Sequence, residues 1–327
     1  MKIALFHNPK AGNAMLNANK LVRQFENARY EVFYASIKEE GWEKALSEPV
    51  DRVVIAGGDG TVSRLAPWLA GRKIPFCILP LGTANNCAKS LGQMHSVESI
   101  IAGLRSERIK QLDLGIVTSS FGHRIFIEAL GIGLLAKFMS EMRALDNNKK
   151  SGFRLSTEER LTNARRHLRL MAKDYPEIKC ELQLDDEIVA GRYLLLEIAN
   201  MPLVGPNLQL VSDADPADGW FDVMWIEGRE RKALRDYLEL CRRDERAIAP
   251  AKTRRCQRVL FRYVDAPAHV DGKAFLSLAK PVSIRLQARA LDLLDLNLNS
   301  EIEDSSSCWS SVLRPRKSTG QEHQVTP

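Results

Sequence analysis

Short apolar runs alternate with stretches of helical periodicity through the first 118 residues. The apolar runs lie at 3–6, 30–34, 53–56, 76–79 and 109–117. The middle runs are continuously apolar, as expected for parallel strands that are covered on both faces, and the segments between them repeat apolar residues at helical spacing. This order predicts a doubly wound parallel-sheet α/β domain over residues 1–120, with ligands bound beyond the carboxyl ends of its strands.

The second half of the chain has a different pattern. Two strand-like runs, 179–184 and 187–199, flank Asp185 and Asp186, which indicates a hairpin. Shorter strand-like runs and two helical stretches, at about 154–174 and 230–246, complete this half. The shorter runs lie at 220–226, 258–263, 268–270 and 281–286. A mostly antiparallel β-sandwich domain is therefore predicted.

The chain length supports two domains, because 327 residues exceed what one compact domain usually needs. We predict that the β-sandwich domain covers residues 121–287 and that residues 288–300 can rejoin the first domain. Residues 301–327 are polar, Ser-rich and aperiodic. They are predicted to form a disordered tail.

Positive charge is concentrated in two stretches. Residues 149–173 hold eight Lys/Arg against two Glu, and residues 229–262 hold twelve against five acids, within a chain of net charge +6. We expect these stretches to attract an anionic membrane surface. Nucleic acid is not expected, because aromatic residues, which would stack on bases, make up only 7%. The alternative is that these are solvated helix faces whose charges pair with each other.

No apolar run approaches the roughly 18 residues that a membrane-spanning helix requires, and the amino terminus lacks a signal-peptide core. The expected location is therefore cytoplasmic, with peripheral association at the inner face of the membrane. The six cysteines show no metal-binding spacing, so we assign them no chemistry.

The sharpest local motif is the GGDGT sequence at 57–61, which directly follows a predicted strand and precedes a predicted helix. Gly57, Gly58 and Gly60 lack a Cβ, so their backbone amides can approach phosphate oxygens at a helix amino terminus. A carboxylate in such a loop would repel phosphate unless it engaged a metal, a water or a substrate hydroxyl. Asp59 is therefore predicted to be catalytic. The alternative is a Gly-rich turn with a capping Asp.

Two further loops follow predicted strands of the same sheet. They are NPKAG at 8–12 and LPLGTANN at 79–86. Each alone is a weak signal, because Pro, Gly and Asn are ordinary turn residues. Together with the GGDGT loop they indicate a phosphate-binding edge of the sheet.

These motifs, followed by LDLG at 112–115 and DADPADGWFDV at 213–223, resemble the catalytic domain of diacylglycerol kinases, in the bacterial lipid kinase group related to sphingosine kinases. GGDGT is also found in NAD kinases, and a similar GGDG in phosphofructokinases, so the later DADPADG segment selects lipid kinases. The resemblance runs in order from residue 3 to about residue 296. It implies use of ATP and Mg²⁺.

The resemblance also implies site residues. Asp59 and Asp113 match two acids of the family's water-linked active-site network. A structural Mg²⁺ of the family would be bound by the Asp218 carboxylate and the backbone carbonyls of Asp215 and Trp220, and oxygen ligands suit a hard cation. Without an ion, the same segment is an acidic turn. The implied nucleotide contacts are Asn8, Ser36, Gly57, Gly58, Asp59, Gly60, Thr61, Val62, Ser63, Arg64, Gly82 and Thr83.

The sequence departs from the family at several of these positions. Asn86 stands where the family commonly has Asp, and Glu128 where it has Asn after the domain hinge. Ser63 and Arg64 replace an Asn and a Glu. The family's DGE motif is Asp271-Gly272-Lys273 here, so Lys stands at the position of the proposed general base.

A lysine cannot replace that glutamate unless its pKa is strongly lowered. Phosphoryl transfer depends mainly on positioning and charge stabilisation, so Asp59 could accept the proton while Lys273 stabilises the transferring phosphoryl group. Glu128 and Asp271 are reserve candidates for the base. The predicted catalytic residues are therefore Asp59, Asp113, Asp271 and Lys273.

Three hypotheses about function follow. The first is an ATP-dependent lipid kinase that phosphorylates the hydroxyl of diacylglycerol or a related lipid alcohol. The second is a NAD-kinase-like phosphotransferase that acts on a soluble hydroxyl. The third is a catalytically silent relative that binds nucleotides or anionic lipids, which the departures at Asn86 and Lys273 suggest.

Overall fold

The first part of the chain forms a four-stranded parallel sheet in the order β2–β1–β3–β4. The computed structural model describes residues 1–296 apart from 12–16, 120–121, 149–154, 246, 265 and 276–280. The predicted tail therefore lies outside the described residues. The strands are β1 (Lys2–His7), β2 (Glu31–Ser36), β3 (Arg52–Gly57) and β4 (Phe76–Pro80).

Alternate residues of these strands point to opposite faces of the sheet, and each face is covered. Leu5 and Val54 belong to one apolar core together with residues of α1 and α4. Phe6 and Ile55 belong to a second core with residues of α2 and η1. Burial on both faces explains why the strand sequences are continuously apolar. The covering elements are α1 (Ala18–Asn27), η1 (Trp42–Leu46), α2 (Asp59–Leu69) and α4 (Val97–Gly103), and α3 (Asn86–Ser90) follows β4.

The second part is built from antiparallel strands, with β9 pairing to β7, β8 and β12. The hairpin predicted around Asp185 forms between β8 and β9. The fold is thus the mixed α/β arrangement that the sequence predicts, with parallel strands first and antiparallel strands after them. The strands are β5 (Ile109–Ser119), β6 (Gly122–Phe126), β7 (Ala129–Gly133), β8 (Ile178–Leu184), β9 (Glu187–Ala199), β10 (Leu203–Val204), β11 (Leu208–Gln209), β12 (Phe221–Glu227), β13 (Lys252–Cys256), β14 (Arg258–Val264), β15 (Ala268–Val270), β16 (Lys273–Phe275) and β17 (Val282–Leu294).

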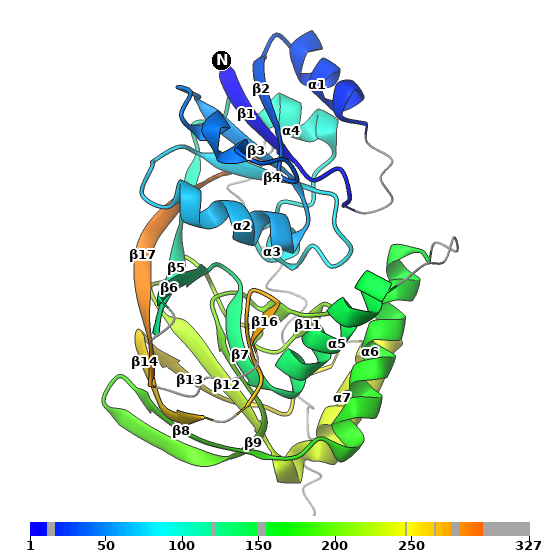
Figure 1. The fold of residues 1–327 in the computed structure, drawn as a ribbon, viewed down its shortest axis with the longest axis vertical. Coiled ribbons are helices and arrows are strands. Elements are labelled where there is room, and N and C mark those ends of the chain that lie inside the picture. The colour runs from blue at the N-terminus through cyan, green and yellow to red at the C-terminus, as the bar shows by residue number, and fades with distance from the viewer. Residues whose placement is uncertain are drawn as a thin grey trace, which may run out of the picture. The chain divides into compact units, whose positions relative to one another are not determined.

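Strand β17, drawn in orange in Figure 1, connects the two sets of strands. It pairs with β14 and β5 in antiparallel fashion, and its Leu293 pairs with Phe76 of β4 in parallel fashion. Strand β5 therefore pairs with β17 and β6 rather than extending the parallel sheet with which the sequence analysis grouped it. The sequence analysis did not predict this because β5 pairs with a strand far along the chain, and an apolar run does not show which strand it will pair with.

Three helices pack beside the antiparallel strands and are drawn in green to yellow in Figure 1. They are α5 (Leu134–Asn148), α6 (Thr157–Asp174) and α7 (Arg231–Arg242), the last preceded by η2 (Gly228–Glu230). Helix α6 begins with a capping box in which Ser156 and Glu159 exchange hydrogen bonds. In the described part of the chain, no helix is long and apolar enough to cross a membrane.

Candidate active site

The three Gly- and Asn-containing loops meet at the carboxyl ends of β1, β3 and β4. The Asn8 amide N–H donates to the carbonyl of Ala56, and the Leu81 N–H donates to the carbonyl of Gly57. The Asn8 side chain also donates to the Thr61 hydroxyl at 3.4 Å. The structure thus brings residues 8–11, 57–61 and 79–86 to one edge, as adjacent parallel strands require.

Glycine is needed where two of these loops touch. A Cβ on Gly58 would lie 2.8 Å from the Cα of Gly82, and backbone atoms cannot move away as a flexible side chain can. A Cβ on Gly60 would meet nothing within 4 Å. Gly58 is therefore required for packing of the loops, whereas Gly60 leaves the first turn of α2 open to a ligand.

The other predicted nucleotide contacts differ in accessibility. Ser36 ends β2 at the same edge and is buried, whereas Thr83 is partly exposed. Val62 and Ser63 are buried on α2, and the Ser63 side chain bonds to Asp271. Arg64 lies over the ring of Trp42 at 5.1 Å and donates to the carbonyl of Ile37 at 2.7 Å. Val62 and Ser63 can therefore support the loop but present little surface to a nucleotide.

Asp59 is the first residue of α2 and points toward α3. Its carboxylate accepts a hydrogen bond from the backbone N–H of Cys87 at 2.9 Å. Burial raises the pKa of Asp59, and hydrogen bonds from the backbone of Cys87 and Asn86 partly offset that rise. The side chain is thus held in place while its proton affinity is increased.

A second carboxyl group, that of Glu128, faces Asp59. Ligand atoms of Asp59, Cys87 and Glu128 all lie within 4.8 Å of one another, and Glu128 is only 5% exposed. Burial raises the pKa of Glu128 well above its ordinary value, and the negative charge of Asp59 raises it further. These two acids, the Asp59–Glu128 pair, cannot both be charged easily, because two negative charges would then lie close together in a buried site.

Asn86 fixes the orientation of Glu128. Its side-chain nitrogen donates to Glu128 Oε1 at 3.1 Å and to the carbonyl of Gly205 at 2.9 Å. Its side-chain oxygen accepts a hydrogen bond from the side-chain nitrogen of Asn207 at 2.6 Å, with the Asn207 amide group turned so that this nitrogen faces Asn86. The neutral residue at position 86 therefore supports an acid at position 128.

The carboxylates of two predicted catalytic acids accept hydrogen bonds from backbone amides. Asp271 accepts hydrogen bonds from the backbone N–H groups of Ile127, Glu128 and Ala129 at 2.9–3.1 Å. Asp113 is 1% exposed and accepts from Gly219 and Arg289, each at 2.8 Å. Both carboxylates tie distant segments together. They therefore have less capacity to act on a substrate than the Asp59–Glu128 pair.

Lys273 directly follows this tethered turn and is exposed. Desolvation lowers the pKa of Lys273, the negative charge of Asp271 raises it, and the charges of Arg64, Arg143 and Arg124 lower it. Three Arg side chains thus lie within electrostatic range of Lys273. The turn carries excess positive charge at the position where the resemblance expects an acid.

The predicted metal turn is held by side chains of the protein. Asp218 forms an ion pair with Arg255, and Asp215 accepts from Lys110 at 3.1 Å. The Arg255 guanidinium also lies over the Trp220 ring at 5.6 Å, and the carbonyl of Asp215 accepts from the Asp218 N–H at 3.3 Å. As arranged, this donor set does not fit a resident Mg²⁺, because a cation would have to displace Arg255.

The first part of the chain matches a known protein family. Residues 2–117 match the sequence profile of the diacylglycerol kinase catalytic domain. This segment belongs to the diacylglycerol kinase catalytic domain family. A protein from Staphylococcus haemolyticus named "putative lipid kinase" is 26% identical over 263 residues, covering 78% of this chain and 80% of that protein. A protein of the same description from Staphylococcus aureus is 23% identical over an equal span and covers the same shares of the two chains.

Solved structures resemble the whole fold. A crystal structure from Bacillus anthracis, described as a "putative diacylglycerol kinase", superposes with a TM-score of 0.68 at 20% identity and covers 90% of this chain and 97% of its own. Another, described as a diacylglycerol kinase from the same organism, gives 0.65 at 20% identity, covering 90% and 96%. At this identity the likeness establishes the fold, including the antiparallel part beyond the family match.

The basic stretches of the chain are largely paired within the protein. Arg169, Arg242 and Arg243 contact Glu239, and Lys252 contacts Glu227. Arg165 is 9% exposed, and its guanidinium donates to the carbonyls of Pro206 and Cys241. Residues 149–154 of the first stretch lie outside the described residues. The described part of both stretches therefore fits the self-paired alternative at many positions.

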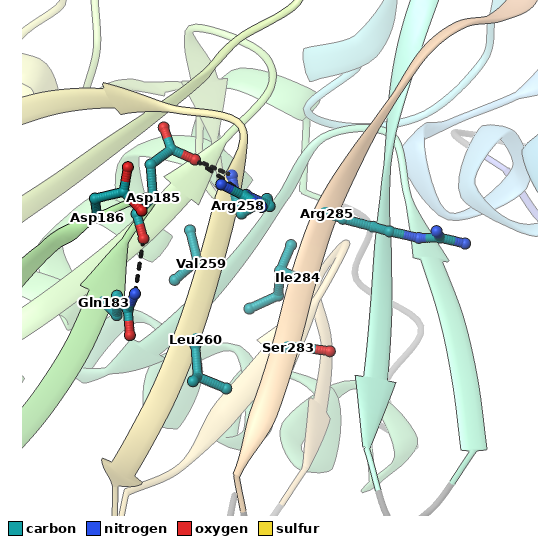
Figure 2. Close-up of a pocket in the computed structure, with 9 residues that line it drawn as sticks. All are labelled: Gln183, Asp185, Asp186, Arg258, Val259, Leu260, Ser283, Ile284 and Arg285. Atoms are coloured by element: carbon teal, nitrogen blue, oxygen red, sulfur yellow. Dashed lines mark hydrogen bonds and ion pairs between the residues drawn. The ribbon is translucent and has the colours of Figure 1, made fainter.

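A shallow pocket on the antiparallel strands contains none of the predicted site residues (Figure 2). Its lining includes Asp185 and Arg258, whose side chains lie 3.7 Å apart, and Gln183 donates to the Asp185 carbonyl. Asp185 and Arg258 of this pocket thus pair with each other.

Several residues at the site were not predicted to act there. Cys87, Asn207, Arg124 and Arg143 carry no recognisable motif, and Glu128 was only a reserve candidate. The sequence does hold a signal for Glu128. Asn86 replaces an acid of the family, whereas Glu128 introduces an acid where the family has Asn, so the two departures can compensate each other. Arg143 lies on α5, a helix that the sequence analysis did not predict.

Proposed function

We propose that this protein is an ATP-dependent lipid kinase that transfers the γ-phosphoryl group to the hydroxyl of diacylglycerol or a related lipid alcohol. The observation that carries the proposal is the Asp59–Glu128 pair beside an open, glycine-lined helix amino terminus. The family of residues 2–117 and the names of the relatives support a lipid as the acceptor.

In the proposed reaction, Gly58 and Gly60 present backbone amides, and α2 its positive end, to the phosphates of ATP. The acceptor hydroxyl oxygen forms a bond to the γ-phosphorus while the bond from that phosphorus to the β–γ bridging oxygen breaks. ADP leaves with the electron pair. The proton of the hydroxyl passes to the Asp59–Glu128 pair, whose high proton affinity suits this role.

Magnesium enters this proposal as part of the ATP complex that is the substrate. No step is assigned to an ion at Asp215, Asp218 and Trp220, since Arg255 engages Asp218. The tethered acids Asp113 and Asp271 are proposed to hold the site together, and Lys273 is proposed to contribute charge.

We further propose that the protein meets its lipid substrate at the inner, cytoplasmic face of an anionic membrane, through exposed cations of 149–173 and 229–262. Arg166 on α6 is exposed and belongs to the first stretch. The attraction is expected to be about 1 kcal/mol for each such cation near the surface and to weaken with salt.

An acceptor panel tests the function. Radiolabelled ATP is supplied with mixed micelles of diacylglycerol and other lipid alcohols, or with soluble hydroxyl compounds that include NAD. Label recovered in an extracted lipid supports the proposal. Label only in NAD would favour the NAD-kinase-like alternative, and nucleotide binding with no transfer to any acceptor would favour a silent relative.

A further inference from the structure

The turn between β10 and β11 carries Asn207, whose side chain contacts the residue that orients Glu128. The Asn207 amide nitrogen donates to Asn86 Oδ1 at 2.6 Å and to the carbonyl of Ala84 at 2.9 Å. Its amide oxygen accepts from the ammonium group of Lys89. Both hydrogens of the Asn207 amide are therefore used, and all three bonds reach α3 or the loop before it.

The same turn is also held by the helices of the second part of the chain. Arg165 of α6 donates to the carbonyl of Pro206 at 3.0 Å, and the Tyr237 hydroxyl of α7 donates to that of Gln209 at 3.0 Å. Strands β10 and β11 share an apolar core with α5, α6 and α7. Asn207 thus reaches the site from a turn whose position is fixed.

Backbone geometry offers a simpler reason for an asparagine at position 207. Its φ is 55°, in the left-handed region that Gly and Asn adopt more readily than other residues. A glycine would meet this requirement without a side chain. A role for the side chain and a role for the backbone alone therefore predict different behaviour for Asn207→Gly.

The side chain of Asn207 completes the hydrogen bonding of a buried amide. Asn86 is 2% exposed, and its nitrogen donates to Glu128 Oε1 at 3.1 Å. Without Asn207 the oxygen of Asn86 would lose this donor, and an unsatisfied buried oxygen is costly. Rotation of the Asn86 amide toward another donor would then weaken its bond to Glu128.

That bond affects the proton affinity of Glu128. Burial raises the pKa of Glu128, and the hydrogen bond from Asn86 offsets part of the rise, so weakening the bond raises the pKa further. Other titratable groups around Glu128 and Asn207 stay in place in a variant at 207. They are Asp59 of α2, Cys87 and Lys89 of α3, Asp271, and the paired Glu197 of β9 and His269 of β15.

We propose that Asn207 is a positioning residue for the transfer reaction, holding the Asn86 amide in the orientation that keeps Glu128 aligned beside Asp59. This inference rests on the proposed kinase function. It adds the β10–β11 turn, which the sequence analysis did not single out, to the segments that shape the site.

Steady-state kinetics across pH test the inference. Asn207→Gly keeps the left-handed backbone and removes the amide. It should lower kcat at about pH 7 fivefold or more, while KM for ATP and for the lipid change less than about twofold. The ascending limb of kcat against pH should move about half a pH unit or more upward, because the Asp59–Glu128 pair accepts a proton only when it carries a negative charge.

Two further variants accompany this measurement. Asn207→Asp keeps the side-chain volume and can still accept from Lys89, but its carboxylate cannot donate to Asn86. It should therefore move the ascending limb in the same direction. Lys73→Gly is the control, since it replaces another residue of positive φ, on the exposed loop before β4, and should match the wild type.

Other results would overturn the inference. An ascending limb that stays in place in both Asn207 variants, whatever their kcat or Tm, would leave position 207 with a purely structural role. A rise in KM with kcat unchanged would show that Asn207 contacts a substrate instead of acting through Asn86.

Failure of the kinase function can be told apart from failure of this inference. If the wild type phosphorylates no acceptor, the Glu128 carboxyl is titrated by carboxyl-carbon NMR of Glu-labelled protein, with its signal assigned by its absence in Glu128→Gln. A midpoint that rises in Asn207→Gly would support the positioning role without the kinase. An unchanged midpoint would overturn it.

Discussion

Individual side chains at this site have different roles, which the motifs alone do not show. Asp271 and Asp113 accept hydrogen bonds from backbone amides, while Asp59 and Glu128 face each other. Burial raises the pKa of Asp59, Glu128 and Asp271 alike. Asn86 donates to Glu128 and so stabilises an acid in place of being one. The site thus retains two carboxyl groups close together although position 86 is neutral.

Glu128→Gln is expected to change the pH dependence of stability. The folded-state pKa of Glu128 lies above its unfolded value, so its contribution to stability is fully present below the unfolded pKa and is lost as pH rises through the folded pKa. Gln does not titrate. The Tm of Glu128→Gln relative to the wild type should therefore increase as pH is raised from about 4 to 8. Differential scanning calorimetry measures this, with the exposed Glu48→Gln as control. A Tm difference that is constant with pH would contradict the raised pKa of Glu128.

At the scale of elements, the strand–loop–helix units could be predicted because they depend on local sequence. Continuous apolar runs and Gly-containing loops locate β1, β3 and β4 and the edge that holds Asp59. By contrast, the partners of β5 depend on Arg285 and Leu286, more than 160 residues away in the sequence, and no local pattern encodes that pairing. The proximity of Glu128 to Asp59 likewise depends on a long-range contact, in which Asn86 at the start of α3 donates to Glu128, the residue before β7.

Gly58→Ala and Gly60→Ala form a matched pair for the loop between β3 and α2. The first places a methyl group against the backbone of Gly82 and should destabilise the protein by about 1–3 kcal/mol. The second meets open space within a helix and should stabilise by up to about 1 kcal/mol. Urea denaturation followed by circular dichroism compares them. Equal stability of the two variants would show that the loops are not packed as described.

Arg165 and Arg166 test the roles of adjacent cations on α6. Arg165→Gln removes donors from the carbonyls of buried Pro206 and partly buried Cys241 and should cost about 1–3 kcal/mol. Arg166 is exposed, so Arg166→Gln should change stability by less than about 0.5 kcal/mol. Any membrane-binding experiment on this stretch should therefore use exposed cations such as Arg166 and leave Arg165 in place. Equal thermal stability of the two variants would contradict the structural role of Arg165.

For the whole molecule, the turn at 213–220 joins β12 to the rest of the fold without needing an ion. Asp113 receives the Gly219 N–H, Gln257 donates to the Gly219 carbonyl, and Arg255 balances Asp218. The sequence identified the acidic turn, but it could not show that Arg255, 37 residues later, contacts it. Such a counterion is visible only in three dimensions.

Metal dependence of stability tests this arrangement. The wild-type Tm should be the same in EDTA and in millimolar Mg²⁺. Arg255→Ala leaves Asp218 without its counterion, so Mg²⁺ should now raise the Tm by a few degrees, corresponding to roughly 1 kcal/mol of binding. The neighbouring Arg254→Ala serves as control and should not respond. A wild-type Tm that falls on adding EDTA would show that the turn holds a metal after all.

The most direct test of the kinase proposal is the initial rate at which wild type and Asp59→Asn transfer radiolabelled phosphate from ATP to a lipid alcohol in micelles. Asn keeps the volume of Asp and can still accept from the Cys87 N–H, so the fold should persist and the Tm should change little. Without the carboxylate to accept the proton, turnover should fall by about 10²-fold or more. Near-normal lipid phosphorylation by Asp59→Asn would contradict the account.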